Sequence, residues 1–399
     1  MKHRTTRAAT AAIFFAISFT RPCFAAPIDV EALTAKLRSV GPQGEGHAEA
    51  AQAWQAIAKA DADQLPAILA GMQGANKLSE NWFRAAVEAV AQRQVKQGGK
   101  LPVEALEGFL ADTRQPPRAR RLAYELIAGV DPAAEQRLIP GLLNDPSVEL
   151  RRDAVALVLK NAVAEEEAGQ KSAAVDAYAK AFAAARELEQ IKEASTKLRA
   201  SEQPVDVPSH MGFVMDWQLI GPFDNRDNKG FDAVYPPEKQ IDLAGTYEGK
   251  VGKVTWKTHR TSDEFGIVDL NEIFERPKEG NDYKLTNEHK GTIGYAFSEF
   301  EIDEPREVEI RIGCINANKV WLNGELLAAN LVYHAGMEVD QYISNGRLKK
   351  GTNQILVKVC QNEQEESWAQ RWQFQLRVCD ELGTAVIANN RALRKTEAN

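Results

Sequence analysis

The stretch KVWLNGELL at residues 319–327 places Asn-Gly between two apolar runs. A two-residue type I′ turn needs positive φ at both central positions, which Asn-Gly adopts readily, so the stretch predicts a β-hairpin. A second turn followed by a buried strand is predicted by RLKKGTNQILVKV at residues 347–359. The residues predicted to form these structural turns are Asn323, Gly324, Gly351 and Asn353.

Period-2 alternation continues on both sides of this hairpin. In REVEIRIGC (306–314) the valine and the isoleucines fall on one face of a strand, and the charged residues fall on the other. This pattern is typical of an antiparallel sheet with one buried face, and several such strands predict a β-sandwich. We place this domain at residues 211–385 and a polar C-terminal tail at residues 386–399.

Residues 28–200 differ, because they are rich in Ala, Leu, Glu and Arg, which favours helix. The segments RAAVE (84–88), RLAYE (121–125) and RDAVA (152–156) indicate a faint internal repeat. A single helix pair cannot bury its own apolar face, so we predict stacked helical repeats, a solenoid. An irregular Ala-rich bundle is the alternative. The polar, proline-containing stretch SEQPVDVPSH at 201–210 is the predicted linker.

The C-terminal strands resemble the galactose-binding-like β-sandwich and are similar to the sugar-binding jelly-roll domain of β-galactosidases and β-glucuronidases. The resemblance rests on Val-Trp-Leu-Asn-Gly at 320–324 and on the Leu-Lys-x-Gly-x-Asn-x-Ile pattern at 348–355. It implies a jelly roll that binds carbohydrate. In the N-terminal part, LLNDPSVELR (142–151) resembles a HEAT repeat, and residues 166–186 resemble a tetratricopeptide helix pair.

The N-terminus begins with basic residues and continues into a short apolar run. A membrane-spanning helix needs about 20 apolar residues, so we predict a cleaved secretory signal peptide at 1–25; an uncleaved anchor is the alternative. Export would place the protein in the periplasm or outside the cell. No later stretch predicts a transmembrane segment. Removal of four basic residues changes the net charge from -7 to -7 - 4 = -11, which disfavours nucleic acid as a partner.

The cysteines beyond the predicted signal are three in number, so at most one disulfide can form among them. Cys314 and Cys360 each end an apolar run that predicts a strand. A bridge between these two residues and a pair of buried free thiols both remain open.

No sequence motif for a catalytic serine, a zinc protease or a phosphate-binding loop occurs, so the chain is predicted not to be an enzyme. The alternative is a glycan-active enzyme or an accessory subunit that uses acidic residues in 224–272. Glycoside hydrolysis would need two carboxyl groups facing each other in a cleft. The acids considered in that range are Asp224, Asp227, Asp232, Asp263, Glu264, Asp269 and Glu272, among others.

No cofactor is predicted. The loop DNRDNKG at 224–230 lacks the EF-hand pattern, because lysine stands where the calcium loop needs glycine. A structural calcium ion stays open as the alternative to a solvated turn, since the sandwiches that the chain resembles often hold one in a loop. Its ligands would be Asp224, Asp227 and Asn228.

Carbohydrate recognition needs exposed aromatic faces together with fixed polar partners. Trp368 lies in the polar stretch NEQEESWAQRW, and the other candidates are Tyr333, His334 and Trp321. The predicted function is therefore an exported, non-catalytic binding or scaffold protein. Its helical repeats would dock an exported or envelope protein, and its sandwich would bind glycan. A purely structural envelope component is a further alternative.

Overall fold

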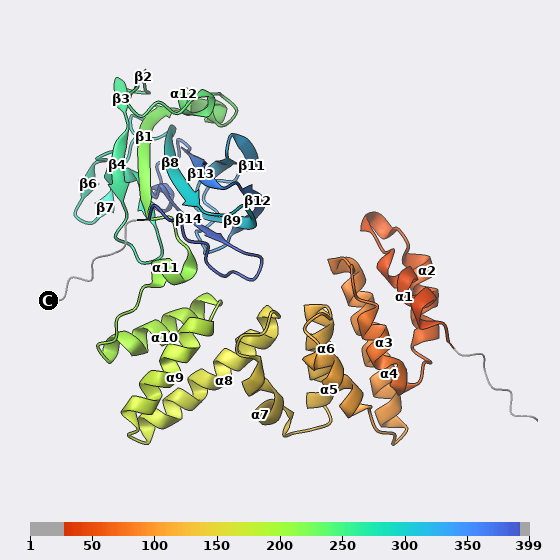
Figure 1. Cartoon of the computed structure of the whole chain (residues 1–399). Coiled ribbons are helices and arrows are strands. Elements are labelled where there is room, and N and C mark those ends of the chain that lie inside the picture. The colour runs from red at the N-terminus through yellow and green to blue at the C-terminus, as the bar shows by residue number, and fades with distance from the viewer. Residues whose placement is uncertain (1–27, 392–399) are drawn as a thin grey trace, which may run out of the picture. The chain divides into compact units, whose positions relative to one another are not determined.

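The computed structural model describes residues 28–391 of the 399-residue chain. The predicted signal segment 1–25 and residues 392–399 of the predicted tail lie outside the described residues. The chain divides into two compact units, of which the first ends at Val130 and the second begins at Asp131 (Figure 1). Within residues 28–391, no helix combines the length and the apolar character that crossing a bilayer requires.

The described part of the N-terminal unit is helical. Its α-helices are α1 Val30–Arg38, α2 His47–Ile57, α3 Leu65–Ala70, α4 Lys77–Lys96, α5 Val103–Ala111 and α6 Pro117–Ala128. The side chain of Asn76 caps α4 by accepting the N–H groups of Leu78 and Ser79 at 2.9 Å each. Helix α1 packs on α2, α5 packs on α6, and α4 contacts the first three helices. These contacts confirm a helical region, whereas the HEAT or tetratricopeptide character stays a prediction.

The C-terminal unit begins with five more helices, namely α7 Ala134–Leu138, α8 Val148–Glu167, α9 Lys171–Ala184, α10 Leu188–Ala200 and α11 Val207–Met211. The division between the units therefore does not coincide with the predicted linker at 201–210. The reason is a shared core, in which Tyr178 and Ile191 from the helices pack with Met211, Phe213 and Met215 at the start of the sandwich. Part of the predicted linker is itself the helix α11.

The rest of the C-terminal unit is an antiparallel β-sandwich (Figure 1). The larger sheet has the strand order β11-β10-β13-β8-β1-β4, and the smaller sheet has the order β12-β9-β14-β5. The larger sheet contains β1 Asp216–Asp224, β4 Lys257–Arg260, β8 Thr292–Ile302, β10 Ala317–Leu322, β11 Glu325–Asn330 and β13 Gly351–Gln361. The smaller sheet contains β5 Val268–Asp269, β9 Arg306–Cys314, β12 Tyr342–Leu348 and β14 Gln373–Cys379.

Short elements connect these strands. They are the hairpin of β2 Thr246–Glu248 with β3 Lys253–Thr255, the hairpin of β6 Lys278–Glu279 with β7 Asp282–Tyr283, and the helices α12 Pro236–Lys239 and α13 Leu270–Ile273. This arrangement confirms the predicted two-part organisation of helices followed by a sandwich. The jelly-roll assignment stays a prediction.

Two apolar cores hold the sandwich together. The first lies between the sheets and includes Trp217 and Trp372, whose indole N–H groups donate to the carbonyls of Val214 at 3.0 Å and Val359 at 3.2 Å. The second lies on the opposite face of the larger sheet, where residues 225–256 cover strands β1, β8 and β13. Burial on both faces explains why the central strands read as continuous apolar runs.

The two predicted turns are joined to each other. Asn323 and Gly324 have φ of 53° and 84° and link β10 to β11, as a type I′ hairpin requires. Gly351, with φ of 86°, begins β13. Asn353 is fully buried, and its side chain accepts a hydrogen bond from Asn323 Nδ2 at 2.9 Å and donates to Lys349 O at 2.8 Å.

Cys314, Cys360 and Cys379 are free and buried, so no disulfide joins them. Burial raises the pKa of both Cys314 and Cys360 to about 12.

The predicted tail begins too early at residue 386, because the Val386 N–H donates to Val378 O at 2.9 Å and its side chain is buried.

Candidate functional site

A hollow of about 880 Å³ opens among the loops of the sandwich. Its walls come from β5, the start of β14, the β6–β7 hairpin and the loop that precedes β14. Trp368, predicted as a ligand contact, lies on a 3₁₀ turn, Ser367–Ala369, at this hollow. Trp368 is 59% exposed, in contrast to the buried Trp217 and Trp372.

A histidine ring contacts the tryptophan. The ring of His334 meets the Trp368 ring edge-on, with 4.9 Å between centroids and 89° between planes. His334 in turn lies 2.9 Å through Nε2 from Asn362 Oδ1. The hollow therefore brings together two of the four predicted aromatic or imidazole contacts from distant parts of the chain.

The loop that carries Trp368 is anchored by buried polar groups. The side-chain carbonyl of Gln370 accepts the N–H of Leu285 at 2.8 Å, and the fully buried Lys290 donates through Nζ to Ala369 O at 2.5 Å. Burial lowers the pKa of Lys290 to about 8, against a smaller opposing effect of Glu366 and Glu365. Both anchors fix the backbone beside Trp368, so the exposed indole has a defined position.

A second set of polar groups also lines the hollow. Asp269 accepts hydrogen bonds from Tyr283 Oη at 3.1 Å and Gln373 Nε2 at 3.0 Å, and it also caps α13 through the N–H of Asn271 at 2.9 Å. Burial, and then the charge of Asp269, raise the pKa of Tyr283. Lys278 Nζ lies 4.7 Å from the centroid of the Tyr283 ring. The arrangement offers fixed acceptors and donors close to an aromatic face.

The remaining predicted ligand residues lie elsewhere. Tyr333 accepts a hydrogen bond from Asn225 Nδ2 at 3.2 Å, and burial raises its pKa to about 12. Trp321 packs against the second core, beside a small cavity of about 110 Å³ on the other face of the larger sheet. Neither residue lines the hollow at Trp368.

The loop considered for calcium neutralises its own carboxylates. Arg226 Nε lies 2.9 Å from Asp224 Oδ1, and Lys229 Nζ lies 2.8 Å from Asp227 Oδ2. These hydrogen bonds lower the pKa of each aspartate. Asn228 continues the turn with φ of 58°. Across residues 28–391 no cluster of three or more His, Cys, Asp or Glu side chains is arranged to hold a metal ion, so the suggested calcium site gains no support.

Of the other acids in 224–272, only Asp269 and Glu272 line the hollow. Asp232 pairs with Lys319 at 3.5 Å, Glu264 pairs with Arg199, and Asp263 accepts the N–H of Phe265 at 2.8 Å. These three acids therefore serve ion pairs and a turn outside the hollow.

Several lining residues were not predicted. Lys278, Tyr283 and Lys284 belong to or follow the β6–β7 hairpin, and Glu365 and Arg371 flank Trp368. The Gly-Asn pair at 280–281 is a hairpin signal in the sequence. It could have located the first group, whereas nothing local indicates that this hairpin meets the Trp368 loop.

No protein-family model matches the chain, and no curated protein matches it. Among solved structures, the chain is similar to a beta-glucosidase from Kluyveromyces marxianus in complex with glucose, at 11% identity and a TM-score of 0.25 over 41% of this chain and 16% of that chain. It is also similar to an anti-sigma factor domain-containing protein from Clostridium clariflavum, at 12% identity and a TM-score of 0.25 over 44% of this chain and 45% of that chain.

A third similar structure is a family 35 carbohydrate binding module from Clostridium thermocellum, at 13% identity and a TM-score of 0.16 over 29% of this chain and 99% of that chain. The chain spans less than a fifth of the length of the beta-glucosidase. The neighbours thus include glycosidase and carbohydrate-binding-module folds. At these TM-scores the likenesses carry no argument about ligand or activity.

Proposed function

We propose that the protein is an exported, non-catalytic binding protein whose sandwich, a jelly roll, holds a glycan in the hollow at Trp368. The observation that carries the proposal is the exposure of Trp368, at 59%, on a loop whose backbone is fixed by Lys290 and Gln370. A large apolar ring on a rigid support loses little conformational entropy when a ligand covers it.

The chemistry of the hollow fits a sugar better than an apolar ligand. The C–H face of a pyranose can pack on the indole, while its hydroxyl groups need fixed hydrogen-bond partners. Asp269, Glu272, Lys278 and Arg371 supply acceptors and donors in the same hollow. Its volume of about 880 Å³ falls in the range of about 300–1,000 Å³ that small-ligand sites occupy.

A glycan array with the full chain, followed by titration of each bound glycan, tests the proposal. Replacing Trp368 by alanine is expected to weaken binding about tenfold or more, because stacking on one aromatic ring contributes roughly 1.5 kcal/mol or more. The matched control is Trp82→Ala in the N-terminal unit, since Trp82 also meets a histidine edge-on, at 5.8 Å from His47. Absence of any bound glycan, or equal weakening by both variants, would refute the proposal.

One observation favours a second candidate, a glycan-active enzyme, because Asp269 and Glu272 lie in the same hollow as Trp368. Asp269 already accepts three hydrogen bonds, so its substitution would also disturb the structure. Glu272 is therefore the more informative residue to substitute. Hydrolysis of chromogenic glycosides that is lost in Glu272→Gln would support this candidate. No hydrolysis by the unaltered chain would remove it.

The helices supply the other half of the proposed function. We infer that they stack as repeats and dock an exported or envelope protein, because paired helices present a long surface without chemistry of their own. Cross-linking of the full chain in the exported fraction, followed by mass spectrometry of the linked peptides, tests this part. Cross-links confined to residues within the chain would leave the third candidate, a purely structural envelope component.

A further inference from the structure

A second cavity, of about 710 Å³, lies within the C-terminal unit and shares no lining residue with the hollow at Trp368. Its walls come from the starts of α8 and α10, residues 337–340, and the outer face of β9 and β14. Apolar side chains form much of this lining, including Met211, Phe265, Met337 and Leu382. Such a mixture of an apolar wall and a few charged groups is typical of small-ligand sites.

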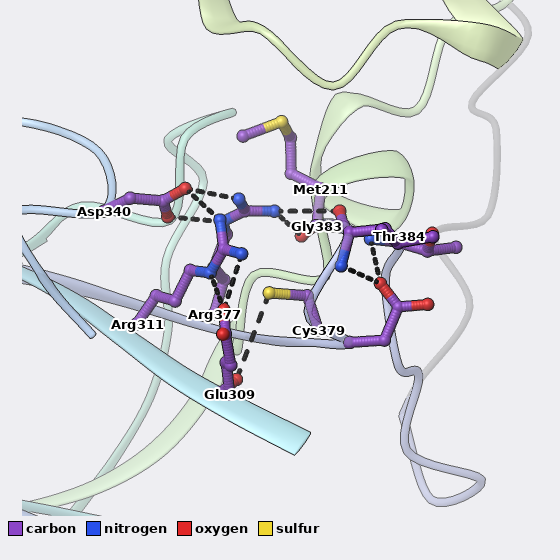
Figure 2. Close-up of polar contacts among 10 residues, drawn as sticks. Met211, Glu309, Arg311, Asp340, Arg377, Cys379, Gly383 and Thr384 are labelled. Carbon is purple, nitrogen blue, oxygen red and sulfur yellow. Dashed lines mark hydrogen bonds and ion pairs between the residues drawn. The ribbon is translucent and has the colours of Figure 1, made fainter. Parts of the chain in front are cut away.

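Two arginines on the sheet side of this cavity are already paired. Arg377 Nε and Arg311 Nη1 donate to the carboxylate of Asp340 at 2.6 Å and 2.7 Å (Figure 2). Arg311 Nε also donates to Glu309 at 2.8 Å. The remaining nitrogen of Arg377, Nη1, donates to the carbonyls of Met211 at 3.0 Å and Gly383 at 3.3 Å. The donors of both guanidinium groups are therefore largely used.

A third arginine, Arg186, lines the same cavity and differs from the other two. Its Nη1 donates to backbone carbonyls at the end of α9, the nearest being Ala185 O at 2.8 Å, and its Nε is buried without a partner. In the part of the chain that the structure describes, no carboxylate forms an ion pair with Arg186. Burial, and then the charges of Arg151 and Arg377, lower the pKa of Arg186, against an opposing effect of Asp380.

The three arginines converge on one place. A Cβ atom built on Gly383 would lie 3.5 Å from Arg377 Nη2, 3.7 Å from Arg311 Nη1 and 3.9 Å from Arg186 Cδ. Asp340 pairs with two of these cations, whereas Arg186 hydrogen-bonds to backbone carbonyls and is influenced by the charge of Asp380. Arg186 is therefore the one of these three arginines for which no carboxylate contact is seen among the described residues.

The N-terminal end of α10 adds to the positive electrostatic potential of the cavity. Glu187, Leu188 and Glu189 line the cavity, and the N-cap Glu187 makes no side-chain capping bond. The N–H groups of the first helical turn are consequently available at the positive end of the helix dipole, which favours a bound anion. The side chains of Glu187, Glu189, Glu338 and Glu381 are exposed and form an acidic rim around the floor.

We propose that this cavity binds a short apolar peptide by its free C-terminal carboxylate. The carboxylate would lie against Arg186 and the first turn of α10, since a guanidinium group and the N–H groups at a helix N-terminus both favour an anion. The apolar side chains of the peptide would cover Met211, Phe265 and Met337, and its ammonium group would face the acidic rim. The floor selects the anion, and the rim disfavours ligands that carry only negative charge.

Calorimetric titration of the full chain with three dipeptides tests this assignment. The probes are Leu-Leu, its C-terminal amide and its N-acetyl derivative, which keep the apolar part and remove one charge each. We expect the amide to bind about tenfold or more weakly than Leu-Leu, because a charge-assisted hydrogen bond is lost, and the acetylated probe to bind more weakly by a smaller factor. Equal affinity for Leu-Leu and its amide would overturn the proposal, as would binding of inorganic phosphate without any dipeptide.

A pair of variants separates the site from general charge effects. Arg186→Gln is expected to abolish the preference for Leu-Leu over its amide, whereas Arg186→Lys should retain part of it. The control is Arg347→Gln, since Arg347 pairs with Glu307 on an exposed edge strand with 72% of its side chain accessible. If Arg186→Gln fails to fold because the end of α9 loses its bonds, the three probes on the unaltered chain still decide. A preference that survives Arg186→Gln in a folded protein would refute the assignment.

Discussion

Replacing Asp340 by asparagine is expected to destabilise the C-terminal unit by about 3–5 kcal/mol, the usual cost of removing one partner from a buried ion pair. The side chains of Arg377 and Arg311 are only 2% and 12% exposed, and that of Asp340 is 23% exposed. Asparagine keeps the shape but removes the negative charge that both guanidinium groups share (Figure 2). Two cations would then face each other in a poorly solvated place, with Glu309 as partner for only one of them.

The same carboxylate predicts a pH dependence with a definite sign. Burial alone would raise the pKa of Asp340, but hydrogen bonds and charge from Arg377 and Arg311 outweigh it and lower the pKa. A carboxyl whose folded-state pKa is lowered stabilises the fold above its unfolded value of about 3.9. That contribution is lost as the pH falls from there through the folded-state pKa. Asp340→Asn should lack this loss.

Urea denaturation followed by near-ultraviolet circular dichroism measures the free energy of unfolding. Hydrogen exchange of peptides from β9 and β14 then locates the effect in the sandwich. The control Glu307→Gln makes the same chemical change in an exposed pair with Arg347, where the side chains are 76% and 72% accessible, and it should cost about 0–1 kcal/mol. If Asp340→Asn costs no more than Glu307→Gln, the argument from buried charge is wrong.

Asn353→Ala should lower the free energy of unfolding by about 2–3 kcal/mol, because the side chain joins both turns through buried hydrogen bonds; the exposed Asn345→Ala is the control in urea denaturation, and equal effects would contradict this role. His210 is held neutral by burial, which lowers its pKa, while its Nε2 lies 2.9 Å from Ala185 O. Stability should therefore fall as the pH drops below about 6.5, and thermal unfolding should show less of this fall in His210→Gln than in His289→Gln.

Local signals in the sequence were sufficient for part of the fold. The Asn323-Gly324 pair predicts its hairpin because the turn chemistry depends on two neighbouring residues only. Strand β9 alternates as predicted, with Val308, Ile310 and Ile312 buried. Neither property requires knowledge of what packs on the strand.

Local sequence signals could not locate the boundary between the two units. Helices α8 to α10 have the same composition as the helices before them, so composition places all of them in one domain. Their apolar faces, however, pack on Met211, Phe213 and Met215. This contact joins segments that are separated along the chain, so local sequence signals do not predict it. The meeting of His334 with Trp368 was hidden for the same reason, since both residues lie in loops without a regular pattern.

Lys358 lies on a strand face that the sequence pattern predicts to be solvated, but other residues cover that face. The covering residues also limit where a ligand can bind. Alternation along β13 would place a lysine on a solvated face, yet Lys358 is fully buried. Its Nζ donates to Ala233 O at 2.7 Å and to Glu238 at 3.0 Å, because residues 225–256 cover that face of the larger sheet. The outer face of the smaller sheet differs, because β9 and β14 line the cavity of about 710 Å³ there. Because residues 225–256 cover the outer face of the larger sheet, the loops at the end of the sandwich are a further approach for a ligand, and Trp368 lies on one of them.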